Sequence, residues 1–219
     1  MDMAAASSRK SGTIFIVDDD ASFLKSLSRL LSAVGYTVRA FESAEEFLKQ
    51  LGPEASGCVV TDLQMQGMDG LKLQEALRKT ANPLPVIFLT GQGDIPTSVS
   101  AMRSGAEDFL TKRAPKEELL AAVERALVRA EQEKEQRAHL EKLRHRFQDL
   151  SDRELEVLSQ VVQGKMNKEI AADLEINERT VKLHRTNLTR KLKVQSVAEL
   201  TRLVDEAGLF KAEKNSRTH

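Results

Sequence analysis

Short apolar segments alternate with amphipathic segments through the first 113 residues of the chain, and this alternation restricts its possible folds more than any other feature. The apolar segments read TIFIV, TVRAF, CVVT, PVIFLT and EDFL. Between and after them, residues 21–33, 43–51, 71–80, 95–104 and those from 116 onward have helical spacing. Strands and helices in strict alternation predict a parallel sheet with helices on both faces. We therefore predict an α/β domain with a doubly wound, five-stranded parallel sheet.

Polar residues stand at the ends of four of these predicted strands. Asp18 and Asp19 follow the first strand, Asp62 the third, Thr90 ends the fourth, and Lys112 follows the fifth. In doubly wound folds the ligand site lies beyond the carboxyl ends of the strands. We therefore expect these five side chains to converge, although the sequence scatters them widely.

The chemistry of this group points to phosphoryl transfer. Asp18, Asp19 and Asp62 would repel one another unless a hard divalent cation lay between them, and carboxylates with water suit Mg²⁺. Transfer of a phosphoryl group needs such electrostatic help, because negative charge spreads over its oxygens in the transition state. Asp62 is then the candidate nucleophile, Thr90 a hydroxyl donor and Lys112 a cationic clamp.

The strings IVDDD, TDLQMQGMDG, FLTGQGD and AEDFLTK, in this order, resemble the receiver domains of two-component response regulators. The resemblance implies a flavodoxin-like fold in which Asp62 accepts a phosphoryl group. It also implies that Mg²⁺ is bound by Asp18, Asp19, Asp62 and the backbone carbonyl of Gln64. Further roles implied by the resemblance are a switch pair, Thr90 and Phe109, and a conserved lysine, Lys112.

Two positions depart from this family's pattern, which usually has proline where this chain has Gln66 and Arg113. A Lys-Pro bond can be cis at a cost of about 0.5–1 kcal/mol, whereas a cis bond before arginine costs about 2.5–4 kcal/mol. We therefore expect the loop after the fifth strand to be either trans or strained, with Lys112 placed somewhat differently.

Residues 116–147 contain no glycine and no proline, which predicts one continuous helix of about 32 residues. Leu140, Leu143 and Phe147 keep an apolar helical spacing at its far end, whereas the middle is polar on every face. Two interpretations stay open: a dimeric coiled coil, in which these three residues face a partner, or a monomeric helical linker.

Residues 150–210 have no strand-like segment and contain four short helical patterns. The patterns at 167–174 and 178–192 are joined by a tight turn, which is typical of a helix-turn-helix. In the second of these, Val181, Leu188 and Leu192 form a core side with His184, which we expect to be packed and hydrogen-bonded. The segment 179–193 holds six basic residues and no acidic one. Its outer side suits the DNA major groove, with these candidate contacts: Lys182, Leu183, Arg185, Thr186, Thr189 and Arg190.

The strings SDRELEVL, QGKMNKEIAADLEINERTVKLHRTNLTRKL and SVAEL closely resemble the LuxR-type helix-turn-helix. This resemblance implies an all-α, four-helix DNA-binding domain. The whole arrangement resembles response-regulator transcription factors of the FixJ and NarL type. We predict a receiver domain at 12–128, a helical linker at 129–149 and the DNA-binding domain at 150–210.

These resemblances imply a non-enzyme that accepts a phosphoryl group from a partner histidine kinase and loses it by autodephosphorylation. Phosphorylation would favour a homodimer on double-stranded DNA, with RNA polymerase as a further candidate partner. Two alternatives remain. One is a phosphatase with an aspartate nucleophile, suggested by Asp18-x-Asp20-x-Ser22. The other is a DNA binder that does not depend on phosphorylation, suggested by Gln66 and Arg113.

The sequence also bears on the compartment. It contains no run of about 18 apolar residues and no signal-peptide core near the start, so we expect no membrane partner. Its one cysteine, Cys58, cannot form an internal disulfide. Both features favour a cytoplasmic protein.

Overall fold

The computed structural model describes residues 12–91 and 95–210, and it divides the chain into two compact units, 1–134 and 135–219. Each unit is described by itself. The predicted domain boundaries at 128 and 149 remain predictions. None of the helices in the described ranges is long and apolar enough to cross a membrane.

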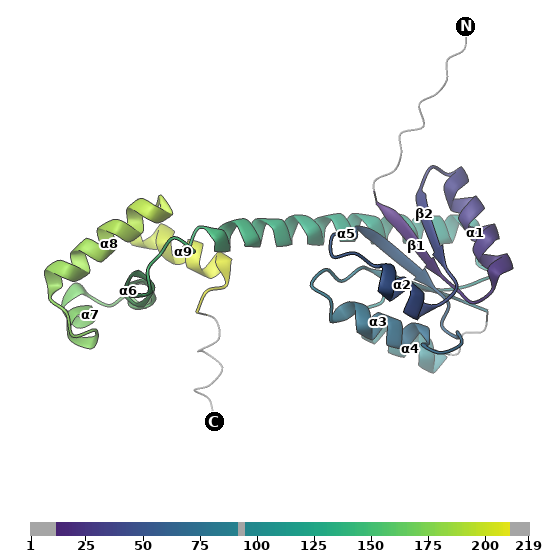
Figure 1. Cartoon of the computed structure of the whole chain (residues 1–219), viewed down its shortest axis with the longest axis horizontal. Coiled ribbons are helices and arrows are strands. Elements are labelled where there is room, and N and C mark those ends of the chain that lie inside the picture. Colours follow the sequence, from purple (N-terminus) through teal and green to yellow (C-terminus); the bar gives the residue numbers. More distant parts are fainter. Residues whose placement is uncertain (1–11, 92–94, 211–219) are drawn as a thin grey trace, which may run out of the picture. The chain divides into compact units, whose positions relative to one another are not determined.

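The first unit is built on one five-stranded sheet (Figure 1). Its strands are β1 (Thr13–Val17), β2 (Thr37–Phe41), β3 (Gly57–Thr61), β4 (Val86–Thr90) and β5 (Asp108–Thr111). All neighbouring strands are parallel, in the order β2-β1-β3-β4-β5. Both β3 and β4 are buried along their whole length, as expected for central strands covered on both faces. The predicted doubly wound α/β fold is confirmed.

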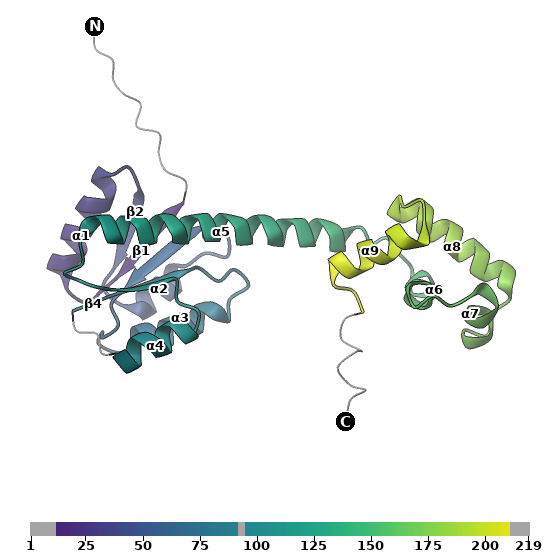
Figure 2. The ribbon, with the colours of Figure 1, turned by 180° about the vertical axis from the view of Figure 1, so that it is seen from behind.

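Two apolar cores lie on opposite faces of this sheet (Figure 1 and Figure 2). One core receives side chains from α1 (Ala21–Ala33) and α5 (Lys116–His145), including Leu27 and Val123. The other receives Phe47, Leu73 and Ala101, which belong to α2 (Ala44–Gln50), α3 (Gly70–Arg78) and α4 (Ile95–Arg103). The helices thus fix the sheet from both sides and leave the carboxyl ends of the strands for the site.

The long helix α5 contributes to both units. Its first half places Leu119, Val123 and Ala126 in the core of the first unit. At its far end Leu143 is buried in the core of the second unit, together with Phe147, which follows the helix. Of the two open interpretations, the one in which Leu143 and Phe147 face a partner chain does not fit, because the same apolar spacing serves packing within the chain. Leu140 is half-buried.

The second unit is a helical domain with one apolar core. It contains α6 (Asp152–Val162), α7 (Asn167–Asp173), α8 (Glu178–Leu192) and α9 (Val197–Ala207). Ser151 and Glu154 form a reciprocal capping box at the start of α6. The turn between α7 and α8 places Glu175 at φ 54°, and Asn177 caps α8 by accepting a hydrogen bond from Thr180 N–H. A helix-turn-helix therefore forms here without glycine in the turn.

Candidate functional site

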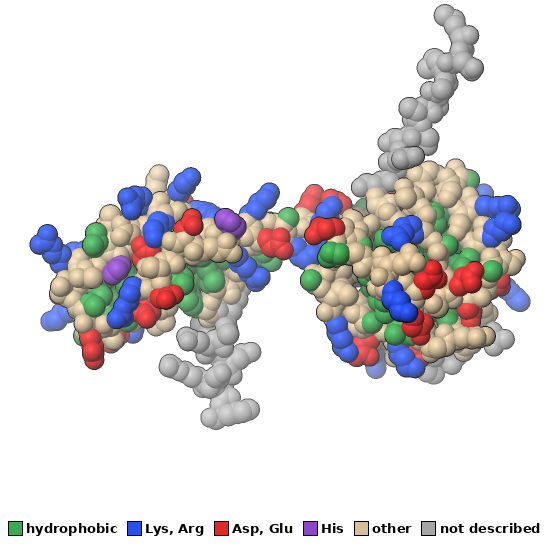
Figure 3. All heavy atoms as spheres, in the orientation of Figure 1, with side chains coloured by type: hydrophobic (Ala, Val, Ile, Leu, Met, Phe, Trp, Pro, Cys, Tyr) green, Lys and Arg blue, Asp and Glu red, His purple; other side chains and the backbone are tan. Residues whose placement is uncertain are grey.

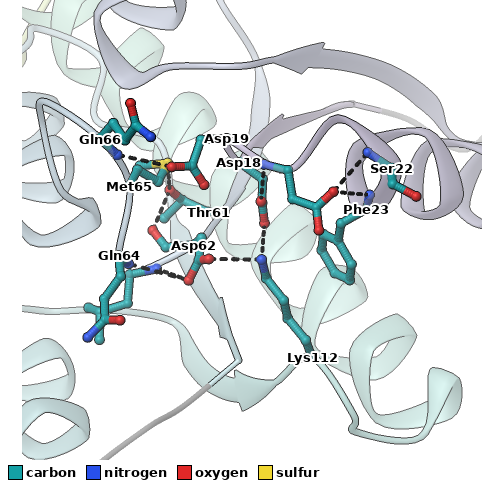
Figure 4. A network of polar contacts seen from close by, with 12 residues as sticks. Asp18, Asp19, Ser22, Phe23, Thr61, Asp62, Gln64, Met65, Gln66 and Lys112 are labelled. Atoms are coloured by element: carbon teal, nitrogen blue, oxygen red, sulfur yellow. Dashed lines mark hydrogen bonds and ion pairs between the residues drawn. The ribbon is translucent and has the colours of Figure 1, made fainter.

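Four of the predicted site residues, Asp18, Asp19, Asp62 and Lys112, come together at the carboxyl edge of the sheet (Figure 4). Strands β1 and β3 are neighbours, and Val17 pairs with Thr61, so Asp18 and Asp62 leave the sheet side by side. Thr90 is the last residue of β4, and Lys112 directly follows β5. The backbone N–H of Lys112 donates a 2.7 Å hydrogen bond to the Thr90 carbonyl. The fold thus gathers residues from four strand ends.

Lys112 bridges the two buried acids of this site. Its Nζ lies 2.6 Å from Asp18 Oδ2 and 2.8 Å from Asp62 Oδ2. The same Nζ lies 4.4 Å from the centre of the Phe23 ring, within the range of a cation–π contact. The described part of the chain contains no cis peptide bond, so the bond before Arg113 is trans. With a trans bond there, Lys112 still reaches both carboxylates.

Burial and hydrogen bonding act against each other in this pair of charges. Burial raises the pKa of Asp18, and hydrogen bonds from Lys112 and from the backbone N–H of Asp20 only partly offset that rise. For Lys112, burial alone would lower the pKa, but hydrogen bonds to Asp18 and Asp62 outweigh it and leave the pKa raised. Lys112 is therefore held in its cationic form, and its hydrogen bond to Asp18 offsets part of the cost of burying that carboxylate.

The three acids form a donor set that fits a divalent cation. Asp18, Asp19 and Asp62 each offer a carboxylate oxygen within 4.8 Å of the others. Asp18 and Asp62 are buried, whereas Asp19 is exposed. Hard oxygen ligands from two or three carboxylates, completed by water, suit Mg²⁺. A bound cation would stabilise the charged form of Asp18, whose pKa is raised by burial.

Asp62 itself is held by its own loop. Its Oδ1 accepts a 2.6 Å hydrogen bond from Leu63 N–H and a long one, 3.4 Å, from Gln64 N–H. Its Oδ2 is bound by Lys112, and 8% of the residue remains exposed. A carboxylate oriented in this way at the molecular surface can act as a nucleophile toward an incoming group.

The structure adds one residue that the sequence did not single out, Gly70, and gives Asp20 a structural role. A Cβ on Gly70 would lie 2.4 Å from the Asp62 carbonyl oxygen and 2.9 Å from the Phe88 ring, so only glycine fits there. Asp20 caps α1 by accepting hydrogen bonds from the N–H groups of Ser22 and Phe23. The start of this helix thus uses Asp20, and its cap does not need Asp18.

The two residues of the predicted switch pair, Thr90 and Phe109, differ in how deeply they are buried. Thr90 is almost completely buried, with 1% of its surface exposed. Phe109 is half-buried, and its ring centre lies 6.0 Å from that of Phe88. The two lie on the neighbouring strands β4 and β5, although Phe109 pairs in register with Phe88.

The outer side of α8 carries the candidate DNA contacts, and Figure 3 shows Lys and Arg side chains projecting from the visible face of the second unit. Lys182, Thr186 and Arg190 are exposed, and Leu183 is 59% exposed although it is apolar. Arg185 is half-buried and donates a 2.9 Å hydrogen bond to Asn167 Oδ1 on α7. Thr189 is half-buried as well. The outer side of α8 therefore combines exposed residues with one residue, Arg185, that is hydrogen-bonded to the neighbouring helix α7.

Two basic or imidazole side chains of α8 have internal roles. Lys191 donates hydrogen bonds to the Asp149 carbonyl, at 2.9 Å, and to Glu154 Oε2, at 2.7 Å. His184 is half-buried as predicted, but its Nδ1 is buried and has no hydrogen-bond partner among the described residues. The expectation of a hydrogen-bonded histidine is wrong for that nitrogen, because the apolar face of α8 offers it no acceptor or donor.

Comparisons with known proteins agree with both units. Residues 14–124 match the family described as "Response regulator receiver domain", and residues 148–204 match "Bacterial regulatory proteins, luxR family". The response regulator protein TmoT of Ectopseudomonas mendocina is 43% identical over 192 residues, which are 88% of this chain and 87% of TmoT. The transcriptional regulatory protein FixJ of Bradyrhizobium diazoefficiens is 37% identical over 199 residues, 91% of this chain and 97% of FixJ.

A solved structure of the response regulator StyR aligns with a TM-score of 0.74 and 41% identity, covering 90% of this chain and 100% of StyR. These likenesses span both units. The matched proteins are transcriptional regulators and not typical enzymes. The chain therefore belongs to the response regulators, and it is a transcription factor that joins a receiver domain to a LuxR-type DNA-binding domain.

Proposed function

We propose that Asp62 accepts a phosphoryl group from a partner histidine kinase and that this reaction changes how the second unit binds DNA. The observation that carries the proposal is the bridge from Lys112 to Asp18 and Asp62 at the carboxyl edge of the sheet. A nucleophilic carboxylate, a cation and two further acids are the groups that phosphoryl transfer requires.

In this proposal a carboxylate oxygen of Asp62 forms a bond to phosphorus, while the bond from phosphorus to the kinase's histidine nitrogen breaks. Leu63 N–H holds one oxygen of Asp62, so the carboxylate keeps its orientation during the attack. The Lys112 ammonium would stabilise the negative charge that develops on the phosphoryl oxygens during the transfer. Asp18, Asp19, Asp62 and the backbone carbonyl of Gln64 would hold Mg²⁺, which neutralises the phosphoryl charge when bound.

The Thr90 hydroxyl would then donate a hydrogen bond to a phosphoryl oxygen, and Phe109 would change its packing against Phe88 as Thr90 moves. Water later hydrolyses the acyl phosphate, so the chain resets without being an enzyme in the usual sense. Two observations support these roles: Thr90 is buried at the end of β4, and Phe109 is half-buried beside Phe88.

For the second unit we propose that α8 enters the major groove and contacts DNA through the six candidates named above, Lys182 to Arg190. One small helix-turn-helix contacts a short site, so two copies would bind adjacent half-sites about one helical turn of DNA apart. Phosphorylation would favour this pairing. RNA polymerase is a further proposed partner once the dimer is on DNA.

One experiment tests both halves of the proposal. DNA binding across genomic fragments is measured with and without a small phosphodonor and Mg²⁺, for the wild-type chain and for Asp62→Asn. We expect the phosphodonor to increase binding of the wild type only, and to leave base-labile label on the wild type only, because asparagine lacks the nucleophilic oxygen. Label that persists on Asp62→Asn would show that the acceptor is another residue. DNA binding by the wild-type chain that is equal with and without the phosphodonor would instead support the phosphorylation-independent alternative.

A further inference from the structure

One of the three acids of the site is tied to the loop that follows the acceptor, which we call the acceptor loop, residues 62–69. Asp19 Oδ2 accepts a 3.1 Å hydrogen bond from the backbone N–H of Gln66, 47 residues away in the sequence (Figure 4). Both residues are exposed, so this bond is one of the few restraints on an otherwise solvated carboxylate.

The donor of this bond depends on the residue type at position 66. Proline has no backbone N–H and could not donate to Asp19. Any other residue could, so the bond is made possible by the departure from proline that the sequence shows at Gln66. The Gln66 side chain itself is not needed, since the donor belongs to the backbone.

A second carboxylate holds the same loop from another element. Glu45, in the first turn of α2, accepts a 2.9 Å hydrogen bond from Met68 N–H through its Oε1. Between the two anchored residues, Gly67 has φ +79°, and a Cβ there would lie 2.8 Å from Glu45 Oε1. The acceptor loop is thus fixed at positions 66 and 68 by one acid from the loop between β1 and α1 and one acid from α2.

We propose that the Gln66 backbone N–H is a positioning group for metal binding: it fixes the Asp19 carboxylate with one oxygen toward the acceptor loop and leaves the other available to the cation. This inference rests on the metal site of the proposed function. An exposed aspartate loses rotamer freedom when it binds an ion, and a carboxylate already fixed by a hydrogen bond loses less. The bond also couples the ion to the acceptor loop, because both share Asp19.

The test compares Gln66→Pro, which removes the donor, with Gln66→Ala, which keeps it. Calorimetric titration of the full chain with Mg²⁺ should give a Kd about tenfold higher for Gln66→Pro than for Gln66→Ala, at the lower end of the loss that outer-shell hydrogen bonds cause at metal sites. Equal Mg²⁺ affinity in the two variants, or tighter binding by Gln66→Pro, would overturn the proposal.

Proline also restricts the loop directly, so a second comparison is needed in the absence of metal. Thermal unfolding of the receiver is measured with chelator for both variants, each in the wild-type and in the Asp19→Ala background. The difference between proline and alanine should be larger when Asp19 is present, because only then does a bond disappear. An equal difference in both backgrounds would show that proline acts on the loop alone, which refutes the role of Asp19. Absence of Mg²⁺ binding by the wild-type chain would refute the proposed metal site, and the unfolding comparison would still decide whether the Asp19–Gln66 bond exists.

Discussion

Lys112 Nζ lies 2.8 Å from Asp62 Oδ2, so the proposed acceptor is paired with a counter-charge from the chain itself. The same ammonium reaches Asp18, whose pKa is raised by burial. A single side chain thus stabilises two carboxylates that would otherwise repel each other. A divalent cation at the same edge of the sheet would share this task with Lys112.

The first prediction follows from the stabilisation of these carboxylates by both Lys112 and a divalent cation. Lys112→Met keeps much of the side-chain length but removes the charge, and should lower the metal-free stability of the receiver by about 3–5 kcal/mol, the usual cost of breaking a buried ion pair by removing one partner. Mg²⁺ should then stabilise the variant more than the wild type, because binding to the folded state supplies the missing charge. Thermal unfolding with chelator and with Mg²⁺ measures both effects. Equal stabilisation of the two proteins by Mg²⁺ would contradict this account.

The second prediction separates base reading from internal support on α8. Lys182 is exposed, and Lys182→Ala should cost about 1–3 kcal/mol on the cognate site and less on random DNA, as expected for a lost base contact. Lys191→Ala is the matched control, because its ammonium binds Asp149 and Glu154 within the unit. It should lower fold stability and weaken binding equally on both DNAs. Competition titrations at two salt concentrations distinguish the two, and equal losses for Lys182→Ala would remove its reading role.

Arg185 can be assigned by the same titrations, since its guanidinium is hydrogen-bonded to Asn167. If the bond orients Arg185 toward bases, Asn167→Ala should reduce the preference for cognate DNA in the same direction as Arg185→Ala. A change at Asn167 that leaves this preference intact would indicate that the pair only joins α7 to α8.

The third prediction concerns pH. Burial alone would raise the pKa of Glu154, but hydrogen bonds from Lys191 and from Ser151 outweigh it and leave the pKa below its usual value of 4.5. A lowered folded-state pKa stabilises the fold above the unfolded-state pKa, and this contribution is lost as the pH falls through the folded-state pKa. Glu154→Gln should therefore cost about 1–3 kcal/mol at pH 7 and progressively less below pH 4.5. Urea unfolding followed through NMR signals of α6 and α8 tests this, and a pH-independent difference would argue against it.

The fourth prediction uses the far end of α5. Phe147 is 5% exposed in the core of the second unit, so Phe147→Ala should destabilise that unit by about 3–5 kcal/mol. Leu140→Ala, at a half-buried position, should cost much less. Phosphorylation of Asp62 should persist in both variants, because the first unit has its own cores. Hydrogen exchange of the full chain locates the loss, and equal protection of α6 to α9 in the two variants would show that Phe147 is not a core residue.

The sequence predicted the sheet well because its central strands β3 and β4 are buried along their whole length and therefore form uninterrupted apolar runs. The predicted α8, at 178–192, has the observed bounds, since Asn177 marks its start and the basic spacing continues to Leu192. The convergence of Asp18, Asp62 and Lys112 was also predictable, because the carboxyl ends of parallel strands share one edge.

Other features depend on contacts that spacing does not encode. Apolar residues at helical intervals mark a buried face, but they do not say whether the covering surface belongs to the same chain, and so the sequence left the packing partner of Phe147 open. Lys191 and Lys182 look alike in the sequence, yet only Lys191 finds a buried carboxylate, that of Glu154. The bond between Asp19 and Gln66 joins a side chain to a backbone donor 47 residues away, which no local pattern reports.

The polar middle of α5 determines where this chain could be joined to a domain from another protein. Ala126 and Ala130 are the last buried residues of its first half, and Leu143 is the next buried residue along the helix. No described side chain between Ala130 and Leu143 is buried, so neither core depends on the segment 131–142. A gene fusion joined within this segment would keep both cores intact, whereas one joined at residue 150 would deprive the DNA-binding domain of Leu143 and Phe147. The junction that would let a receiver and a DNA-binding domain be exchanged without loss of either core therefore lies inside the helix α5 and not in a loop.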